Sequence, residues 1–270
     1  MRSLTYSGLQ DGRSAALVNG RYESPPLAGG KTVRRSVVLV RDYRLVGDLD
    51  GSGQDEAVTL LGENMGGSGT FNYVAVVGWR DGQPVNVATA PLGDRVQLRH
   101  GRIAGRRLVL DLVQASPQDA ACCPGALVRR TWGLDGTTLR EVGPAQQDGR
   151  LTPGVLEGTE WTLRWWDFDE PVRSDVSITL TVAGNRVAGR SGCNRYNASL
   201  TSGRVPGALT IGAAVGTRMM CPEPMMSAER RYLAQLAGSR TFSFLAGQLV
   251  LSWNTDATLG TMLFESQPVP

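Results

Sequence analysis

The chain has 270 residues, of which 41% are hydrophobic and 20% are charged, so it can bury enough apolar surface for two domains and is not a disordered polymer. Its net charge is only +3 and like charges do not run in blocks, so we expect no nucleic-acid partner. The sequence contains no apolar run of roughly 18 residues, so no transmembrane segment is expected.

Short strands separated by glycine-rich turns are expected throughout the first half of the chain. Stretches rich in Val, Leu and aromatic residues are separated by Asp-Gly dipeptides and other turn-forming clusters. We place extended segments at residues 35–40, 56–61, 71–79, 85–89, 95–99, 108–113 and 127–132. Their length and spacing predict an antiparallel sheet, sandwich or blade-like unit, in a β-rich N-terminal domain over residues 1–142.

An acidic loop leads into the second of these strands. Asp48, Asp50, Ser52 and Glu56 place oxygen side chains at alternate positions, which can wrap a hard cation as in the first half of an EF-hand loop. The loop resembles the Asp-rich loop of FG-GAP and integrin-type repeats, which implies calcium ligation by these side chains and the backbone oxygen of Gln54. Ser52 stands where a third Asp is expected, and no second copy supports a propeller. The alternative is an acidic β-turn, and both stay open.

Two adjacent cysteines, Cys122 and Cys123, precede Pro124. Adjacent cysteines can bond to each other only by straining the peptide between them. Two interpretations stay open: a vicinal disulfide that fixes a turn, and two reduced thiols. The chain has no C-x-x-C spacing and His100 is its only histidine, so a zinc site is hard to assemble.

A segment without strand-like alternation separates the two halves, and we assign a linker to residues 143–155. In the second domain, 156–270, the clearest strand is 176–182, where apolar residues alternate with Ser and Thr. An amphipathic helix is expected over Met225–Ala237, with Glu229 on its mostly polar side. Closing strands are expected at residues 240–245, 248–253 and 261–264. The chain is therefore predicted to be mainly β, an α+β protein with two antiparallel β-rich domains.

The second half resembles the META domain of the HslJ-like heat-shock family over about residues 156–265. The resemblance rests on Trp161-Thr162-Leu163, Gly192-Cys193-Asn194-Arg195-Tyr196 and Thr217-Arg218-Met219-Met220-Cys221-Pro222, in that order before the helix. It implies a small antiparallel β fold with one packed helix. It also implies a bacterial envelope protein or lipoprotein linked to stress or antibiotic tolerance, and it supplies no catalytic residue.

Cys193 and Cys221 lie one in each of the two hallmark segments, 28 positions apart. A fold that brings these segments together could bridge them by a disulfide. In the chain-entropy model, a loop of that length contributes roughly 3 to 4 kcal/mol of stability. Two buried free thiols are the alternative. A reactive thiol is a third reading, disfavoured because the only histidine lies in the other half.

The cysteines and the first residues of the chain bear on the cellular compartment in which the protein is expected. Residues 1–5 lack the apolar core of a signal peptide, so the sequence predicts either a cytoplasmic protein or a mature form whose signal segment is absent. An even number of cysteines without metal-ligand spacing favours the second reading. We therefore expect a periplasmic or envelope protein, compatible with a lipid anchor on its precursor.

Catalysis has little support in the residues. A Ser-His-Asp or Cys-His mechanism would need His100, which we expect in an exposed hairpin turn between Arg99 and Arg102. We therefore expect a non-catalytic envelope protein that binds an unknown envelope component through its first domain, with no cofactor unless calcium occupies the acidic loop. The alternative is a hydrolase that attacks a cell-wall component through carboxylates in an interdomain groove.

Overall fold

The chain folds into two compact units, Met1–Gly149 and Arg150–Pro270. A computed structural model describes residues 1–26, 34–41, 43–120, 122–255 and 258–268. The boundary between the units falls inside the 143–155 segment to which the sequence assigns a linker. Among the described residues, no helix is both long and apolar enough to cross a membrane.

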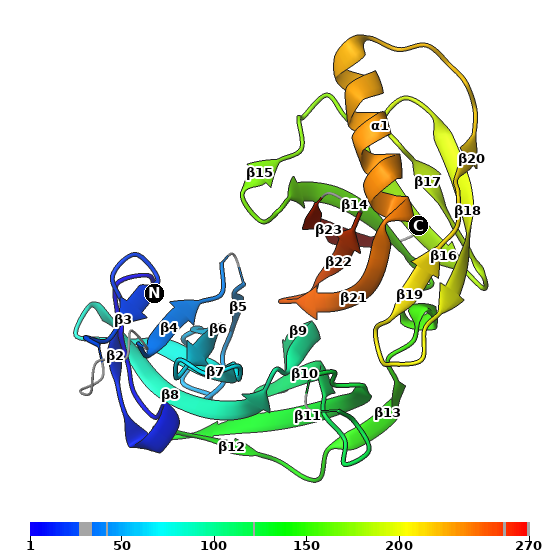
Figure 1. Ribbon diagram of the computed structural model, residues 1–270. Coiled ribbons are helices and arrows are strands. Elements are labelled where there is room, and N and C mark those ends of the chain that lie inside the picture. The colour runs from blue at the N-terminus through cyan, green and yellow to red at the C-terminus, as the bar shows by residue number, and fades with distance from the viewer. Residues whose placement is uncertain (27–33, 42, 121, 256–257, 269–270) are drawn as a thin grey trace. The chain divides into compact units, whose positions relative to one another are not determined.

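The larger sheet of the first unit has six strands, all antiparallel (Figure 1). Its central strands β6, β7 and β8 are long and rich in Val, Leu and Ala, and the two-residue turn Asp81-Gly82 joins β7 to β8. In sheet order the strands are β3 (Arg21–Glu23), β4 (Ser36–Leu39), β6 (Glu56–Asn64), β7 (Phe71–Arg80) and β8 (Gln83–Asp94), with β5 (Leu45–Gly47) also paired to β6.

The second sheet of this unit has five strands. Its order is β12 (Thr138–Glu141), β11 (Ala126–Asp135), β10 (Arg107–Gln114) and β9 (Gln97–Ala104), with β13 (Gln146–Arg150) also paired to β11. Leu108, Leu110 and Leu112 alternate along β10 and are fully buried, which is the period-2 pattern of a strand with one face in the core.

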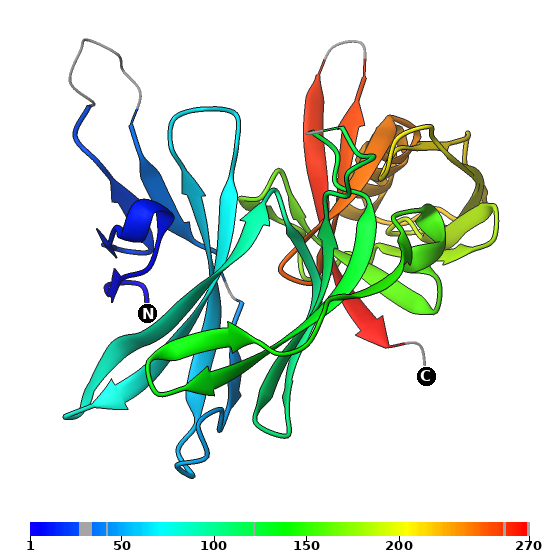
Figure 2. The same ribbon diagram turned by 90° about the horizontal axis from the view of Figure 1, so that it is seen from below.

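The N-terminal segment lies beside β3 and β4 (Figures 1 and 2). It contains the short strands β1 (Thr5–Tyr6) and β2 (Ala15–Ala16), which pair with each other, and the 3₁₀ turn η1 (Gln10–Gly12). Tyr6 and Leu9 pack into one cluster with Val37 of β4 and Leu61 of β6. This shared core attaches the segment to the six-stranded sheet.

Several details of the first unit differ from the sequence expectations. The strand expected at residues 95–99 begins in a turn, because Arg95 has positive φ and β9 starts only at Gln97. Strand β13 occupies a stretch in which we expected no strand, and all its side chains are exposed, so no hydrophobic alternation marks it. His100 was expected in a hairpin turn but lies within β9, opposite Asp111 of β10. The turn falls at Gly105 and Arg106, both of which have positive φ.

The second unit is one antiparallel sheet of ten strands that nearly closes into a barrel. Its order is β19 (Leu209–Ile211), β18 (Arg195–Ser202), β17 (Arg186–Arg190), β16 (Thr179–Ala183), β14 (Thr159–Trp166), β23 (Leu259–Pro268), β22 (Gln248–Asn254) and β21 (Ser239–Leu245). Two short strands extend it, β15 (Glu170–Pro171) on β14 and β20 (Val215–Gly216) on β18. An isolated bridge between Ala208 and Thr241 joins the two ends of the sheet. The turn η2 (Pro153–Leu156) precedes β14.

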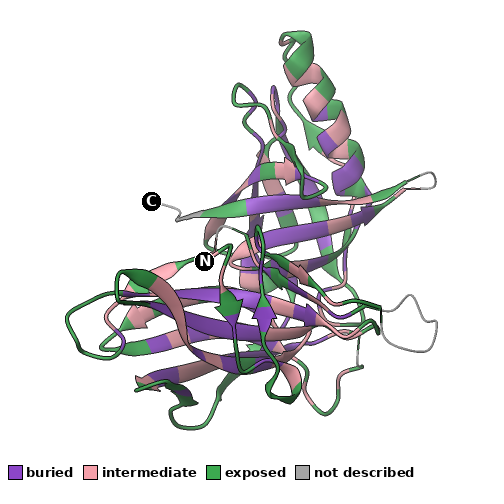
Figure 3. Cartoon of the chain, turned by 90° about the vertical axis from the view of Figure 1, so that its left-hand side faces the viewer, coloured by how far each residue is buried: buried purple, intermediate pink, exposed green. Residues whose placement is uncertain are grey.

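One helix, α1 (Glu223–Ala237), packs against this barrel, and the expected helix over Met225–Ala237 is confirmed. Tyr232 and Leu236 are fully buried, whereas exposed residues cover the opposite side of the helix (Figure 3). The Tyr232 ring meets the rings of Tyr196 and Phe264 edge-on, with centroids 5.5 and 6.5 Å away. The mainly β fold class predicted for the chain is therefore observed.

The strand expected at 176–182 is shorter than its alternation suggests. Regular pairing begins only at Thr179, and Ile178 makes an isolated bridge with Ser191. Val176 and Ile178 are still buried, as the alternation requires. The side-chain pattern therefore identifies the buried face correctly, whereas the ladder begins where Thr179 pairs with Thr162 of the neighbouring strand β14.

Candidate functional site

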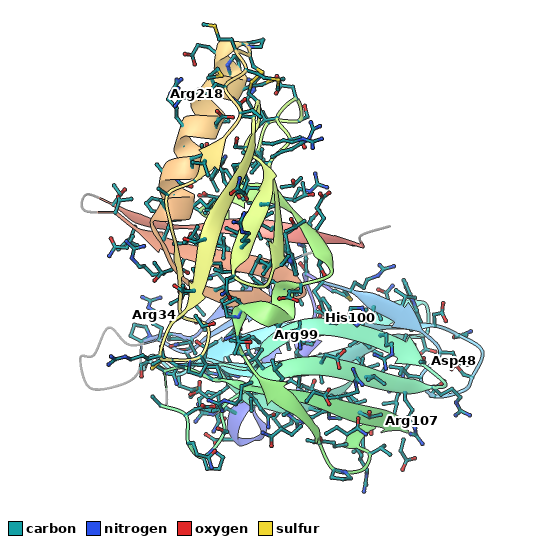
Figure 4. All side chains as sticks on the ribbon, turned by 90° about the vertical axis from the view of Figure 1, so that its right-hand side faces the viewer. Arg34, Asp48, Arg99, His100, Arg107 and Arg218 are labelled. Atoms are coloured by element: carbon teal, nitrogen blue, oxygen red, sulfur yellow. A yellow bond between two sulfur atoms is a disulfide. The ribbon has the colours of Figure 1, made fainter. Side chains whose placement is uncertain are left out.

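The acidic loop between β5 and β6 brings three of its predicted ligands together. One carboxylate oxygen from each of Asp48, Asp50 and Glu56 lies within 4.8 Å of the others. Asp48 is labelled in Figure 4, in the first unit. Glu56 is the first residue of β6 and is buried, so the strand fixes one of the three carboxylates.

Backbone N–H groups of the same loop already donate to these carboxylates. Asp48 accepts from Gly51 at 2.6 Å and from Gly53 at 3.1 Å. Glu56 accepts from the N–H of Leu49 at 2.8 Å. The two bonds to Asp48 form an Asx-type turn, and with the bond to Glu56 they hold these two carboxylates in place whether or not a cation binds.

Asp50 connects the loop to a neighbouring hairpin. Its carboxylate accepts a 2.8 Å bond from the N–H of Ser52. Hydrogen bonds from the Ser52 hydroxyl and N–H lower the pKa of Asp50, with a smaller contribution from the charge of Arg106. The Arg106 guanidinium also donates to the backbone oxygen of Asp50. A cation from the chain itself therefore neutralises part of the loop.

The remaining two predicted ligands have local roles. The Ser52 hydroxyl accepts a 3.2 Å bond from the N–H of Gln54, and both residues are exposed. The arrangement suits a hard divalent cation such as Ca²⁺ through its three carboxylates. It equally suits a self-contained acidic turn, and both readings of the sequence stay open.

The second unit contains a polar cluster centred on Glu229 of α1. The carboxylate of Glu229 accepts bonds from the Ser191 hydroxyl at 2.7 Å, the Asn194 N–H at 2.8 Å and the Asn194 amide at 2.9 Å. Burial raises the pKa of Glu229, but the hydrogen bonds from Ser191 and Asn194 outweigh it and hold the pKa below its usual value. The carboxylate is thus held ionised.

Asn194 connects this helix to the second hallmark segment. Its side-chain oxygen accepts bonds from the Thr217 hydroxyl at 2.7 Å and the Met219 N–H at 2.8 Å. The hydroxyls of Tyr196 and Tyr232 lie 2.6 Å apart, and Tyr196 also donates to the backbone oxygen of Thr179. These polar groups are used to join elements of the fold, which is a structural role.

The predicted disulfide between Cys193 and Cys221 is present, with Cα atoms 5.9 Å apart. It crosses the same two segments that Asn194 joins by hydrogen bonds. Covalent and polar links therefore reinforce each other around the start of α1, which Figure 4 shows near Arg218.

Glu229 is the residue that the sequence reading misplaced. It was expected on the polar side of the helix, but its side chain is buried. Its position, four residues after Met225 and three before Tyr232, does place it on the apolar face. A charge at such a position indicates a partner across the fold, and that signal could have identified it.

The adjacent pair Cys122 and Cys123 is also joined by a disulfide. It lies in the connection between β10 and β11. The Asp119 carboxylate closes this connection independently, because it accepts bonds from the N–H groups of Ser116 and Gly125 at 2.8 and 3.0 Å. With both bridges formed, the chain has no free cysteine.

His100 has neighbours that do not form a catalytic triad. Its Nδ1 lies 4.0 Å from the Asp111 carboxylate, beyond hydrogen-bond distance, and its side chain is largely exposed. Asp111 accepts a 2.7 Å bond from the Arg129 guanidinium instead. Figure 4 shows His100 and Arg99 on the first unit.

Comparison with known proteins assigns a family to part of the chain. Residues 154–265 match the family model of the META domain. A similar solved structure is an NMR structure of a protein from Burkholderia xenovorans, which is 27% identical over 43% of this chain and 86% of that chain, with a TM-score of 0.35. No curated protein matches. The resemblance of the acidic loop to FG-GAP repeats finds no support in these comparisons.

Proposed function

Because residues 154–265 form a META domain, we propose that the chain is a non-catalytic, stress-related binding protein of the bacterial cell envelope, with the first unit as its recognition module. The observation that carries this proposal is the pairing of all four cysteines in disulfides. Disulfides persist in oxidising compartments such as the periplasm and are rare in the reducing cytosol. We therefore place the protein in the periplasm, and a lipid anchor on its precursor would be compatible with this location.

The non-catalytic reading is supported by what the reactive side chains do. The cysteine sulfurs are bonded to each other, so no thiolate is available as a nucleophile. The buried polar groups of the META domain are hydrogen-bonded to one another around Glu229. His100 lies 4.0 Å from the Asp111 carboxylate, which Arg102 and Arg129 also approach.

Thiol trapping tests whether the four cysteines pair in an oxidising compartment, on which the envelope assignment depends. Cells that produce the chain with a bacterial export signal are treated with a maleimide under denaturing conditions, with and without prior reduction. We expect mass additions only after reduction, on all four cysteines. Maleimide addition without reduction would refute an oxidised, exported protein.

Capture from envelope extract tests the binding function. The immobilised chain should retain a defined envelope component, and the isolated second unit should not. Incubation with purified cell-wall sacculi is the parallel assay. Release of fragments would support the carboxylate-dependent hydrolase instead and would refute the non-catalytic reading.

Calcium binding by the first unit is a second candidate function. The convergence of three carboxylates within 4.8 Å is the observation that favours it. A bound Ca²⁺ would add ligand bonds to a loop that leads directly into the buried strand β6 and would stabilise that unit.

A further inference from the structure

A pocket of about 520 Å³ lies on the second unit, and the strands β14, β16, β17 and β18 supply most of its lining. This volume is within the range of small-molecule binding sites. Every residue that lines it belongs to the described part of the chain.

The pocket lies where the ladder between β16 and β17 ends. Regular pairing joins Thr181–Ala183 to Arg186–Ala188 and goes no further along these strands. Beyond it, the N–H of Arg190 donates to the hydroxyl of Thr179 at 3.1 Å. Thr179 is almost fully buried and lines the pocket. Because a hydroxyl that accepts a bond keeps its own proton, Thr179 can still donate to a ligand.

Two arginines stand side by side in this pocket. Arg190 of β17 and Arg195 of β18 lie directly opposite each other in the register of the two strands. Their N–H groups donate to the hydroxyls of Thr179 and Thr217, so the two arginines form a non-hydrogen-bonded pair, in which opposed side chains come closest. Like charges placed directly opposite each other destabilise a sheet. Among the described residues, neither guanidinium has an ion pair or a hydrogen bond. An anionic group between them would relieve their repulsion.

A carboxylate lines the same pocket. Thr162 of β14 pairs with Thr179, so Glu160, two residues before Thr162, projects from the same face of the sheet. Glu160 likewise has no ion pair within the described part of the chain. Ala188 also lines the pocket, and its short side chain leaves space for a ligand. The pocket thus presents unpaired groups of both signs.

We propose that this pocket binds a small zwitterion, a free α-amino acid or a short peptide, with its carboxylate between Arg190 and Arg195 and its ammonium group at Glu160. Guanidinium groups match a carboxylate in paired hydrogen bonds, and an ammonium group has three donors for carboxylate and hydroxyl oxygens. A ligand with negative charge alone would meet Glu160 as a like charge, which favours a zwitterion over a simple anion. The site lies on the second unit, so this inference goes beyond the recognition proposed for the first unit and does not rest on it.

The test is calorimetric titration of the full chain with alanine and with alanyl-alanine. The N-acetyl form of each probe keeps only the carboxylate, and the C-terminal amide keeps only the ammonium group. The site variants are Arg190→Gln with Arg195→Gln, and Glu160→Gln. The matched control is Arg186→Gln with Arg204→Gln, which removes the same charge as the arginine variant from exposed arginines of the same unit outside the pocket. Thermal unfolding shows that each variant folds, as expected for exposed or half-buried side chains.

At least one of the two free probes should bind, and its N-acetyl and amide forms should bind about tenfold more weakly or less. Each site variant should weaken binding by about the same factor, and the control variant should bind as the wild type does. Binding of alanine identifies a free amino acid as the ligand, whereas binding of alanyl-alanine alone identifies a peptide. The proposal is overturned if neither free probe binds, if a blocked form binds as tightly as its free probe, or if site and control variants lose affinity equally.

Discussion

Glu229 and Asn194 are joined by two hydrogen bonds, because the Glu229 carboxylate accepts from both the backbone N–H and the side-chain amide of Asn194. The same Asn194 accepts bonds from Thr217 and Met219 through its side-chain oxygen. One buried side chain on the helix thereby fixes the turn after β17 and, through Asn194, the segment before the helix. The two hallmark segments of the META domain converge at this point.

The Glu229 network should make the stability of the second unit depend on pH. The folded pKa of Glu229 is lowered, so the stability it contributes is present above its unfolded pKa, about 4.3, and is lost as pH falls through the folded pKa. Glu229→Gln places an amide N–H₂ group against donors and should cost about 1–3 kcal/mol at neutral pH. Thermal unfolding followed by circular dichroism should show that the difference in unfolding temperature between Glu229→Gln and the wild type becomes smaller below about pH 4.

Glu223→Gln is the matched control, because Glu223 lies on the same helix and is largely exposed. Its unfolding midpoint should follow that of the wild type at every pH. If the difference in unfolding temperature between Glu229→Gln and the wild type stays constant down to acidic pH, the Glu229 carboxylate is not ionised in the folded state.

Removal of the Cys193–Cys221 bridge should destabilise the second unit far more than removal of Cys122–Cys123 destabilises the first. The Cys193–Cys221 bridge closes a loop of 28 positions and so restricts the unfolded chain, whereas the Cys122–Cys123 bridge joins neighbouring residues and restricts it little. Cys193→Ala with Cys221→Ala should cost about 3–4 kcal/mol in urea unfolding. Cys122→Ser with Cys123→Ser should cost under about 1 kcal/mol. Similar costs for the two double variants would contradict this account.

Much of the fold could be predicted from local patterns. The strand expected at 71–79 is β7, Phe71–Arg80, and the expected helix begins two residues earlier than predicted. Both follow from side-chain periodicity, which is a property of neighbouring residues. All five residues of strand β13 are exposed, and the strand is held by backbone pairing to β11. Because that pairing is non-local and leaves no hydrophobic pattern, the sequence does not indicate it.

The contacts of the acidic loop likewise include some that local sequence spacing predicts and some that only the tertiary fold creates. The carboxylates of Asp48, Asp50 and Glu56 converge because their alternate spacing lies within one loop. Arg106 reaches that loop from the turn between β9 and β10, 56 positions beyond Asp50, so its contact depends on the tertiary fold.

A buried ion pair should make the first unit sensitive to a single charge deletion. Arg35 Nε lies 2.5 Å from Glu63 Oε1, and both side chains are almost fully buried. Glu63 also accepts from the N–H of Gln10 at 3.1 Å, and Arg35 donates to the backbone oxygen of Ser14 at 3.0 Å. Arg35→Met leaves Glu63 buried without its cation and should cost about 3–5 kcal/mol in the calorimetric transition of this unit.

Two further variants separate the charge from the packing. Arg35→Met with Glu63→Leu removes both charges and should recover much of the loss, because an apolar pair can replace a buried ion pair. Arg13→Met removes the exposed pair with Asp11, 3.9 Å apart, and should cost under about 1 kcal/mol. If the double variant is no more stable than Arg35→Met, the loss comes from the backbone contacts of Arg35 and not from the unpaired carboxylate.

Calcium should stabilise the first unit through the acidic loop if the three carboxylates ligate it. At a concentration one hundred times its dissociation constant, a ligand that binds only the folded state adds about 2.7 kcal/mol of stability. Asp50→Asn removes one exposed carboxylate of the three and should abolish the calcium-dependent rise in unfolding temperature. Asp135→Asn, at the end of β11 and outside the loop, should leave that rise unchanged.

Calorimetric titration distinguishes the two readings of the loop, because an acidic turn closed only by Gly51, Gly53 and Leu49 gives neither heat nor a thermal shift with millimolar Ca²⁺. That result would leave the turn as the sole role of the loop, with Arg106 as its counter-ion.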